Sequence, residues 1–167
     1  MKKFYITIII LSLIILTGII FYLNIEKTEE ENNISPLNKN ALSSPEVQAL
    51  NLAIDGKFKS RAVSWKALNE FGETAPFEKM AESEQQVIDY IKIFFTKYSI
   101  QVPENEWLMK INFNSTEEAC KKGINVEEEN IRLYDEFSGK LKNQEIIELF
   151  SFLKSTAENN IKIFENC

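Results

Sequence analysis

Residues 77–98 have the sequence FEKMAESEQQVIDYIKIFFTKY, and this stretch decides which fold the chain can adopt. At about 100° per residue, its large apolar side chains fall on one face of a helix, within roughly 40° of Glu84. Burying a carboxylate in the middle of such a face is costly unless a cation, a metal ion or hydrogen-bond donors meet it. The stretch therefore predicts an amphipathic helix whose Glu84 has a partner on another element. The apolar side chains are Phe77, Met80, Ile88, Ile91, Phe95 and Tyr98.

A helix is predicted before this stretch, over residues 44–71. Ser44 can cap a helix, Pro45 suits the first helical position, and Glu46 complements the positive end of the helix dipole. Gly72 predicts the end of this helix, because glycine readily adopts the left-handed conformation that follows many last turns. The connection to the helix after Pro76 is short, so the two helices should be antiparallel.

Two more helices are predicted beyond residue 99. Residues 100–113 have no helical period, which predicts an irregular connection. Ser115 and Glu118 have the spacing of a capping box and predict the start of the third helix. Asn143 can cap the fourth helix.

Each predicted helix carries a polar residue within its apolar face. In the first helix Arg61 falls near the centre of that face and Lys57 near its edge; Arg61 either extends past the core to solvent or neutralises a buried acid. Glu127 and Asn160 fall at the middle of the third and fourth faces. The pattern predicts an all-α, antiparallel four-helix bundle with an internal polar layer. The apolar face of the first helix consists of Val47, Leu50, Ile54, Phe58, Trp65, Leu68 and Phe71.

The N-terminal segment predicts a membrane anchor. Residues 4–23 are uncharged and long enough to cross a bilayer as a helix. No small-x-small cleavage site follows, so a retained single-pass anchor is favoured over a cleaved signal peptide. Lys2 and Lys3 precede the span and an acidic segment follows it, which places the N-terminus in the cytoplasm and the bulk of the protein outside it. We thus expect an anchor at residues 1–23, a polar tether at 24–43 and the bundle at 44–167.

The amino-acid composition argues against several classes of fold and function. Hydrophobic residues make up 44% of the chain, and the low content of Gly (5) and Pro (4) favours helices over a turn-rich β fold. The net charge is −6; without Lys2 and Lys3, 17 basic residues face 25 acidic ones, a net charge of −8. This balance disfavours nucleic acid as a partner. The absence of histidine removes the commonest general base and a common metal ligand.

Cys120 and Cys167 are the two cysteines of the chain. In an antiparallel hairpin with its turn near residues 141–143, the start of the third helix lies beside the end of the fourth. A domain outside the cytoplasm permits disulfides, so we predict a Cys120–Cys167 disulfide, with two unpaired thiols as the alternative.

Four motifs resemble those of a known family in their order and spacing: GKFKSRA at residues 56–62, AESEQ at 81–85, VPENEW at 102–107 and GINVEEENIRLYD at 123–135. The chain resembles the small ferritin-like domain family of unknown function found in bacteria and archaea, from about residue 47 to 164. The resemblance implies a ferritin-like four-helix fold, in which inward Glu residues and Glu-x-x-His pairs can hold two metal ions.

The ligand positions implied by this resemblance are mostly changed. Glu84 and Glu127 match the expected pattern, but Lys57 stands where a Glu is expected. Val87 and Asn160 occupy positions where His is expected, and Ala157 stands where a Glu-x-x-His pair would have its Glu. Two carboxylates do not supply the charge and coordination that two divalent ions need.

We therefore predict that Lys57 and Arg61 form a buried ion-pair network with Glu84 and Glu127, in a layer that includes Asn160. A Schiff-base role for Lys57 is disfavoured, because two nearby acids would raise its pKa.

The leading hypothesis for function is a non-catalytic, membrane-anchored interaction or structural module with no cofactor and no catalytic residue. The alternative is a metal-binding protein or oxidoreductase that holds iron or manganese with Glu84 and Glu127, and with Glu82, Glu128 or Asp135 nearby. A third hypothesis is a small-molecule binder, for which plain core packing is the simpler explanation. Its binding residues would be the aromatic side chains Trp65, Phe94, Phe95 and Tyr134.

Overall fold

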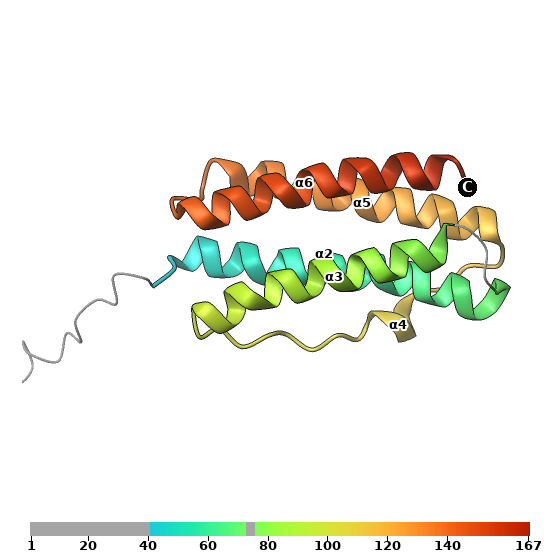
Figure 1. The fold of residues 1–167 in the computed structure, drawn as a ribbon, viewed down its shortest axis with the longest axis horizontal. Coiled ribbons are helices and arrows are strands. Elements are labelled where there is room, and N and C mark those ends of the chain that lie inside the picture. Colours follow the sequence, from blue (N-terminus) through green and yellow to red (C-terminus); the bar gives the residue numbers. More distant parts are fainter. Residues whose placement is uncertain (1–40, 73–75) are drawn as a thin grey trace, which may run out of the picture. The chain divides into compact units, whose positions relative to one another are not determined.

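Four long helices make up most of the described protein. The structure, a computed structural model, describes residues 41–72 and 76–167, and the regular secondary structure of this part is all helical, as the sequence predicts. The long helices lie side by side, and a one-turn helix lies in the connection between the second and the third (Figure 1). The helices are α2 (Ser44–Phe71), α3 (Phe77–Lys97), α4 (Trp107–Lys110), α5 (Thr116–Ser138) and α6 (Gln144–Glu165).

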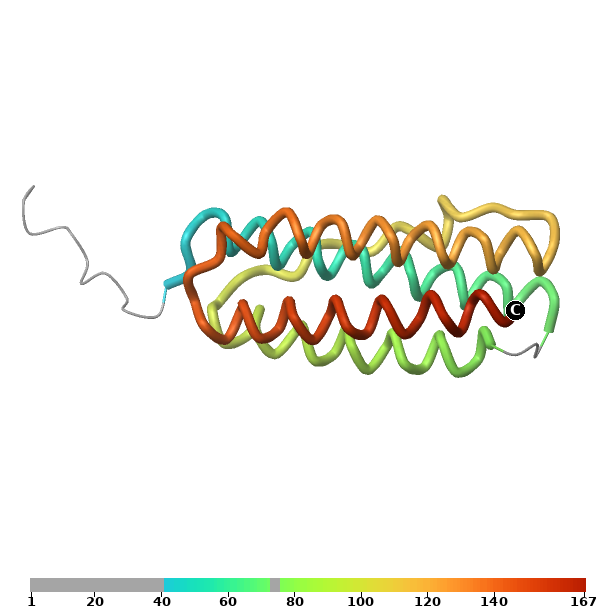
Figure 2. Tube along the Cα trace, turned by 90° about the horizontal axis from the view of Figure 1, so that it is seen from above, coloured from blue at the N-terminus to red at the C-terminus, as the bar shows by residue number. Residues whose placement is uncertain are grey.

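The chain forms two helical hairpins joined by a long crossover. α2 and α3 run in opposite directions, as do α5 and α6 (Figure 1). Between α3 and α5 the chain returns along the length of the helices, so that α5 starts at the same end as α3 (Figure 2). α2 packs against both α3 and α5, and α6 packs against α5 and more sparsely against α3. Every pair of neighbouring long helices is therefore antiparallel.

The start of α2 differs from the prediction by one residue. Ser43, not Ser44, is the N-cap, and Pro45 occupies the second helical position. The backbone N–H and the hydroxyl of Ser43 both donate to Glu46 Oε2, at 2.8 and 2.6 Å. Glu46 stands three residues after Ser43, the capping-box spacing, and this pair determines where the helix begins.

The other predicted helix ends are confirmed. Gly72 ends α2 with a φ of +81° and donates its N–H to Leu68 O at 3.0 Å. Ser115 Oγ accepts the N–H of Glu118 at 3.2 Å, although the Glu118 carboxylate binds the N–H of Asn114 in place of that of Ser115. Asn143 Oδ1 accepts the N–H of the second residue of α6, Glu145, at 3.0 Å.

The connection predicted to be irregular contains the short helix α4. Its Trp107 indole donates to Asp55 Oδ1 of α2 at 2.7 Å. Ile111, directly after α4, is buried against Ala62, Val63 and Val126. These contacts hold the crossover against α2 and α5.

The core consists of two main apolar clusters with polar residues between them. The larger cluster contains Leu50 and Ile54 of α2 and aromatic side chains of the other three helices. The smaller cluster lies toward the opposite ends of the helices and includes Phe77 and Phe164. Most buried polar residues fall in sequence between the two clusters, and Lys57 lies beside Phe58 at the edge of the larger one. The residues between the clusters are Ser60, Ser64, Glu84, Glu127, Asn130 and Asn160.

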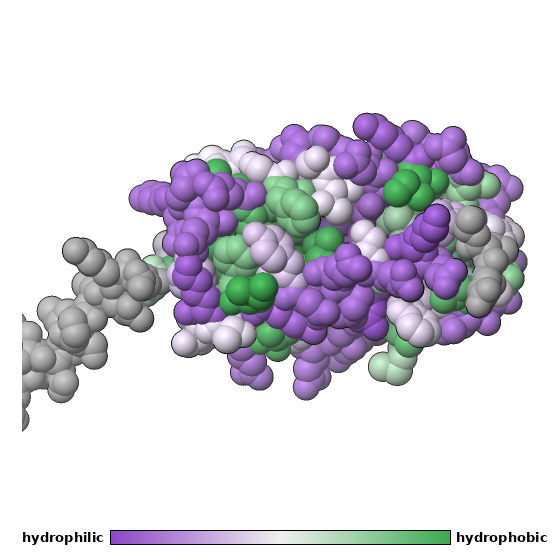
Figure 3. Space-filling model, viewed as in Figure 1, coloured by the Kyte–Doolittle hydropathy of each residue, from purple (hydrophilic) through white to green (hydrophobic). Residues whose placement is uncertain are grey.

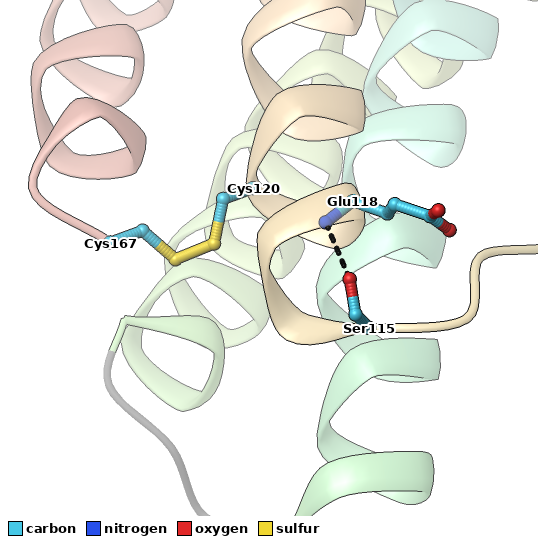
Figure 4. Close-up of a disulfide and its surroundings, with 4 residues drawn as sticks. All are labelled: Ser115, Glu118, Cys120 and Cys167. Atoms are coloured by element: carbon cyan, nitrogen blue, oxygen red, sulfur yellow. Dashed lines mark hydrogen bonds between the residues drawn. A yellow bond between two sulfur atoms is a disulfide. The ribbon is translucent and has the colours of Figure 1, made fainter.

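A disulfide joins Cys120, in the first turn of α5, to Cys167 after α6, with the two Cα atoms 6.1 Å apart (Figure 4). The predicted pairing is thus present. Nearby, Gly123 permits close packing of α5 on α6, because a Cβ at this position would lie 2.6 Å from the ring of Phe164.

The predicted anchor at residues 1–23 and nearly all of the predicted tether at 24–43 lie outside the described residues. Within residues 41–72 and 76–167, no helix has the length and apolar character that a membrane span requires.

Candidate functional site

A buried lysine in the middle of α2 lies between glutamates of two other helices. The Lys57 side chain is fully buried, as are those of Glu84 and Glu127. Lys57 Nζ donates to Glu84 Oε1 of α3 at 3.2 Å and to Glu127 Oε2 of α5 at 3.0 Å. One ammonium group therefore bridges two carboxyl groups inside the bundle.

Asn160 brings α6 into the same group of residues. Its amide nitrogen donates to Glu84 Oε1 at 2.5 Å and to Glu127 Oε1 at 3.1 Å. The two carboxyl groups thus share two donors, Lys57 and Asn160. We refer to Lys57, Glu84, Glu127 and Asn160 as the polar layer.

Two further donors to Glu127 are residues that the sequence analysis missed. The Ser60 hydroxyl donates to Glu127 Oε1, and Asn130 Nδ2 donates to Glu127 Oε2 at 3.2 Å. Gly56 makes room for Asn130, because a Cβ there would lie 2.1 Å from Asn130 Oδ1. A sequence signal was available: Ser60 and Asn130 each stand three residues after a member of the polar layer and so share its helix face.

Glu84 has far fewer partners than Glu127. Both of its described hydrogen bonds are accepted by Oε1, whereas Oε2 is buried and has no hydrogen-bond partner among the described residues. The hydroxyl groups of Ser64 and Tyr134 are also buried without such a partner. The polar layer is therefore well satisfied around Glu127 and incompletely satisfied around Glu84.

Because of this difference in hydrogen bonding, Glu84 and Glu127 have different pKa values. Burial raises the pKa of Glu84 to about 8; Lys57 opposes the shift, and the nearby charge of Glu127 adds to it. Burial also disfavours the charged form of Glu127, but Lys57 and Ser60 outweigh it and hold the pKa of Glu127 below its usual value. At neutral pH Glu127 is thus ionised and Glu84 is protonated.

The same environment keeps Lys57 charged. Burial alone would lower the pKa of Lys57, but Glu84, Tyr134 and Glu127 together raise it above its usual value. Burial raises the pKa of Tyr134, so its hydroxyl is neutral as well. With Lys57 positive and Glu127 negative, the polar layer has no net charge, which is the arrangement that a low-dielectric interior favours.

Arg61 does not belong to the polar layer. It is partly buried, and its guanidinium donates to Gln85 Oε1 on α3. The prediction placed Arg61 at the centre of the apolar face and Lys57 at its edge, but Lys57 is the fully buried residue, and Trp65, assigned to that face, is 42% exposed. The reason is that small side chains make up much of the buried face of α2. They are Ala49, Ala53, Ser60, Ser64 and Ala67.

The residues present do not fit a two-metal centre. Lys57 Nζ occupies the space between Glu84 and Glu127, and a divalent cation there would be repelled by the ammonium group. Glu82 and Glu128 are exposed, and Asp135 is paired with Lys154 at 2.6 Å. In the part of the chain that the structure describes, no three His, Cys, Asp or Glu residues are grouped as metal ligands would be.

The aromatic residues considered for small-molecule binding do not form one site. Phe94, Phe95 and Tyr134 belong to the larger apolar cluster, whereas Trp65 lies on the surface. Val87 and Ala157, which stand where metal ligands were expected, are buried in the same cluster. Core packing accounts for all of these residues except Trp65.

Comparison with known proteins shows the fold alone. No protein-family model and no curated protein sequence matches the chain. A hypothetical protein from Methanococcus jannaschii is similar in structure, with a TM-score of 0.67 and 23% identity over 78% of this chain and 83% of that one. A conserved hypothetical protein from Mycobacterium tuberculosis has a TM-score of 0.63 and 8% identity, over 74% and 97% of the two chains. A DUF305 fragment from Deinococcus radiodurans has a TM-score of 0.63 and 10% identity, over 75% and 96%.

Proposed function

We propose that this protein is a membrane-anchored, extracytoplasmic ferritin-like domain protein that is non-catalytic and acts as an interaction or structural module. In this proposal, the polar layer takes the place of a di-metal centre. The observation that carries the proposal is the fully buried Lys57 ammonium, which contacts Glu84 at 3.2 Å and Glu127 at 3.0 Å.

The helix topology supports the ferritin-like part of the proposal. Two antiparallel hairpins joined by one long crossover are the arrangement of ferritin-like bundles, whereas an up-down-up-down bundle has short loops throughout. Glu84 and Glu127 also lie on two different helices and face the same interior point, as the resemblance implies.

The replacement of metal by an ammonium group follows from charge. A carboxylate pair in a dry interior needs compensating positive charge, which a metal ion or a buried lysine can supply. Lys57 supplies one positive charge, and the protonation of Glu84 removes the need for a second one. The charge of the polar layer is then balanced without a cofactor.

Metal analysis of the purified full-length chain tests this proposal. After incubation with Fe²⁺ or Mn²⁺ and dialysis, we expect the wild-type chain to retain no stoichiometric metal. Lys57→Glu would supply a third inward carboxylate in place of the ammonium group, and we expect this variant to retain more metal than the wild type. Stoichiometric iron or manganese on the wild-type chain would support the metal-binding alternative and contradict the proposal.

Reporter fusions test the membrane part of the proposal separately. A C-terminal alkaline phosphatase fusion should be active, because this enzyme folds only outside the cytoplasm, and a C-terminal fluorescent protein that folds only inside should be dark. The full-length chain should sediment with the membrane fraction. The opposite fusion pattern, or a chain that stays in the soluble fraction, would contradict this placement.

A further inference from the structure

A surface groove lies between the start of α3 and the end of α6, where these two helices pack sparsely. The groove is open to solvent and has a volume of about 620 Å³, which is within the range of roughly 300–1,000 Å³ that small-molecule sites occupy. One part of its wall is apolar and consists of Pro76, Met80 and Ile163. The remainder is polar and consists of Lys79, Ser83, Lys162 and Asn166.

The two lysines of this groove are unpaired. Most Lys and Arg side chains at residues 41–72 and 76–167 contact a carboxylate, but Lys79 and Lys162 have no ion-pair partner there. The acidic side chains of the same part of α3, Glu78 and Glu82, line a different groove beside Trp65. Two lysines without an ion-pair partner among the described residues therefore line one groove, although the chain as a whole is acidic.

The apolar part of the groove wall indicates that a ligand bound there would also have an apolar part. Ile163 is 43% exposed, and the face over α3 and α6 carries apolar patches among hydrophilic side chains (Figure 3). A ligand that covers Ile163 gains the free energy of burying the exposed apolar surface of this side chain. A ligand that places an anion between Lys79 and Lys162 gains charge-assisted hydrogen bonds, which are the stronger class.

We propose that the groove lined by Lys79, Lys162, Met80 and Ile163 binds a small carboxylate with an apolar tail. The carboxylate lies between the two ammonium groups, where the Ser83 hydroxyl and the Asn166 amide are further donors. The tail lies on Ile163 and Pro76. This site is separate from the polar layer and does not depend on the proposed function.

Binding of 4-phenylbutyrate to the full-length chain in nanodiscs of zwitterionic lipid tests the site. Titration calorimetry, with empty nanodiscs subtracted, should show saturable binding. We expect the uncharged 4-phenylbutyramide and inorganic phosphate each to bind at least about tenfold more weakly, since each lacks either the charge or the tail. Equal binding of the amide would overturn the role of the lysines, and tighter binding of phosphate would overturn the role of the tail.

A pair of double variants with the same charge change locates the binding. Lys79→Gln/Lys162→Gln should weaken 4-phenylbutyrate binding by about tenfold or more. Lys122→Gln/Lys142→Gln removes two other lysines that have no described ion-pair partner and should leave the Kd within about twofold. Ile163→Asn should also weaken binding, and melting temperatures show whether each variant is folded. Unchanged binding in the first double variant, or an equal loss in both, would overturn the proposal.

Discussion

Glu46 and Glu84 are both buried glutamates, yet they ionise in opposite ways. Glu84 contacts the Lys57 ammonium, and burial nevertheless raises its pKa to about 8. The described hydrogen-bond donors to Glu46 include no Lys or Arg side chain. Burial would raise the pKa of Glu46 as well, but the donors around it hold this pKa at about 2.

The difference lies in how many donors reach each carboxylate. Glu46 Oε2 accepts the N–H and O–H of Ser43, and Oε1 accepts the backbone N–H groups of Lys142 and Asn143 at 2.9 and 2.6 Å. Glu84 uses one oxygen for both of its bonds, and the negative Glu127 beside it competes for the same donors. Donors to both oxygens thus stabilise a buried carboxylate more effectively than one shared cation does.

Removing the shared cation should have the largest effect. Lys57→Ala leaves the ionised Glu127 buried without a positive partner and is expected to lower the free energy of unfolding by about 3–5 kcal/mol. Urea denaturation at pH 7 measures this loss. Lys66→Ala is the matched control on the same helix, because the Lys66–Glu70 pair is partly exposed to solvent and should contribute less than about 1 kcal/mol. Similar small losses in both variants would mean that Lys57 does not stabilise the bundle.

The proton on Glu84 should make stability depend on pH. The pKa of Glu84 is about 8 in the folded chain and 4.5 in the unfolded chain. Between pH 4.5 and about 8, Glu84 therefore holds a proton in the folded state that it has released in the unfolded state. Stability from Glu84 is therefore fully present below pH 4.5 and is lost as pH rises through about 8, by up to about 5 kcal/mol. Denaturation from pH 5 to 8 should show this decline in the wild type, and Glu84→Gln should flatten it. A wild-type stability that rises over this range would contradict a protonated Glu84.

Amide substitutions at the two acids of the polar layer should then differ at pH 7. Glu127→Gln removes the negative charge that balances Lys57 and should cost about 2 kcal/mol. Glu84→Gln replaces a carboxyl group that is already neutral and should cost less than about 1 kcal/mol. Because the two residues are equally buried, burial alone predicts equal losses. Equal losses would show that the proton is shared evenly between the two acids.

The sequence predicts the helices and all four polar-layer residues, and it places three of these residues at the middle of their apolar faces for a physical reason. α3, α5 and α6 carry large apolar side chains on one face, so Glu84, Glu127 and Asn160 stand out within it. α2 packs against both α3 and α5, and its contact surface is rich in Ala and Ser. Its large apolar residues therefore do not mark the centre of the buried face. Lys57 and Arg61 differ by only about 40° on a helical wheel. The prediction therefore placed both residues in the network, with Arg61 at the centre of the face, whereas Lys57 is the residue that contacts the two acids.

The environment of Glu46 could not be predicted from local sequence. Its position in the first turn of α2 indicates a favourable interaction with the helix dipole, and this interpretation predicts an exposed side chain. Two of its donors, Lys142 and Asn143, lie nearly a hundred residues further along the chain. Only the packing of the α5–α6 turn against the start of α2 brings them to the carboxylate. The same packing buries Glu46, so that 4% of it is exposed.

Glu46→Gln tests the other side of the comparison and should lower the free energy of unfolding by about 1–2 kcal/mol at pH 7. Because the folded pKa of Glu46, about 2, is below its unfolded value of 4.5, its contribution is present above pH 4.5 and is lost as pH falls toward 2. The wild type and Glu46→Gln should therefore differ at pH 7 and converge near pH 2, as measured by urea denaturation. The Gln side chain keeps one oxygen acceptor, but its NH₂ group cannot accept a hydrogen bond. If the difference in free energy of unfolding between the wild type and Glu46→Gln did not vary with pH, the effect of Glu46 would come from hydrogen-bond geometry and not from its charge.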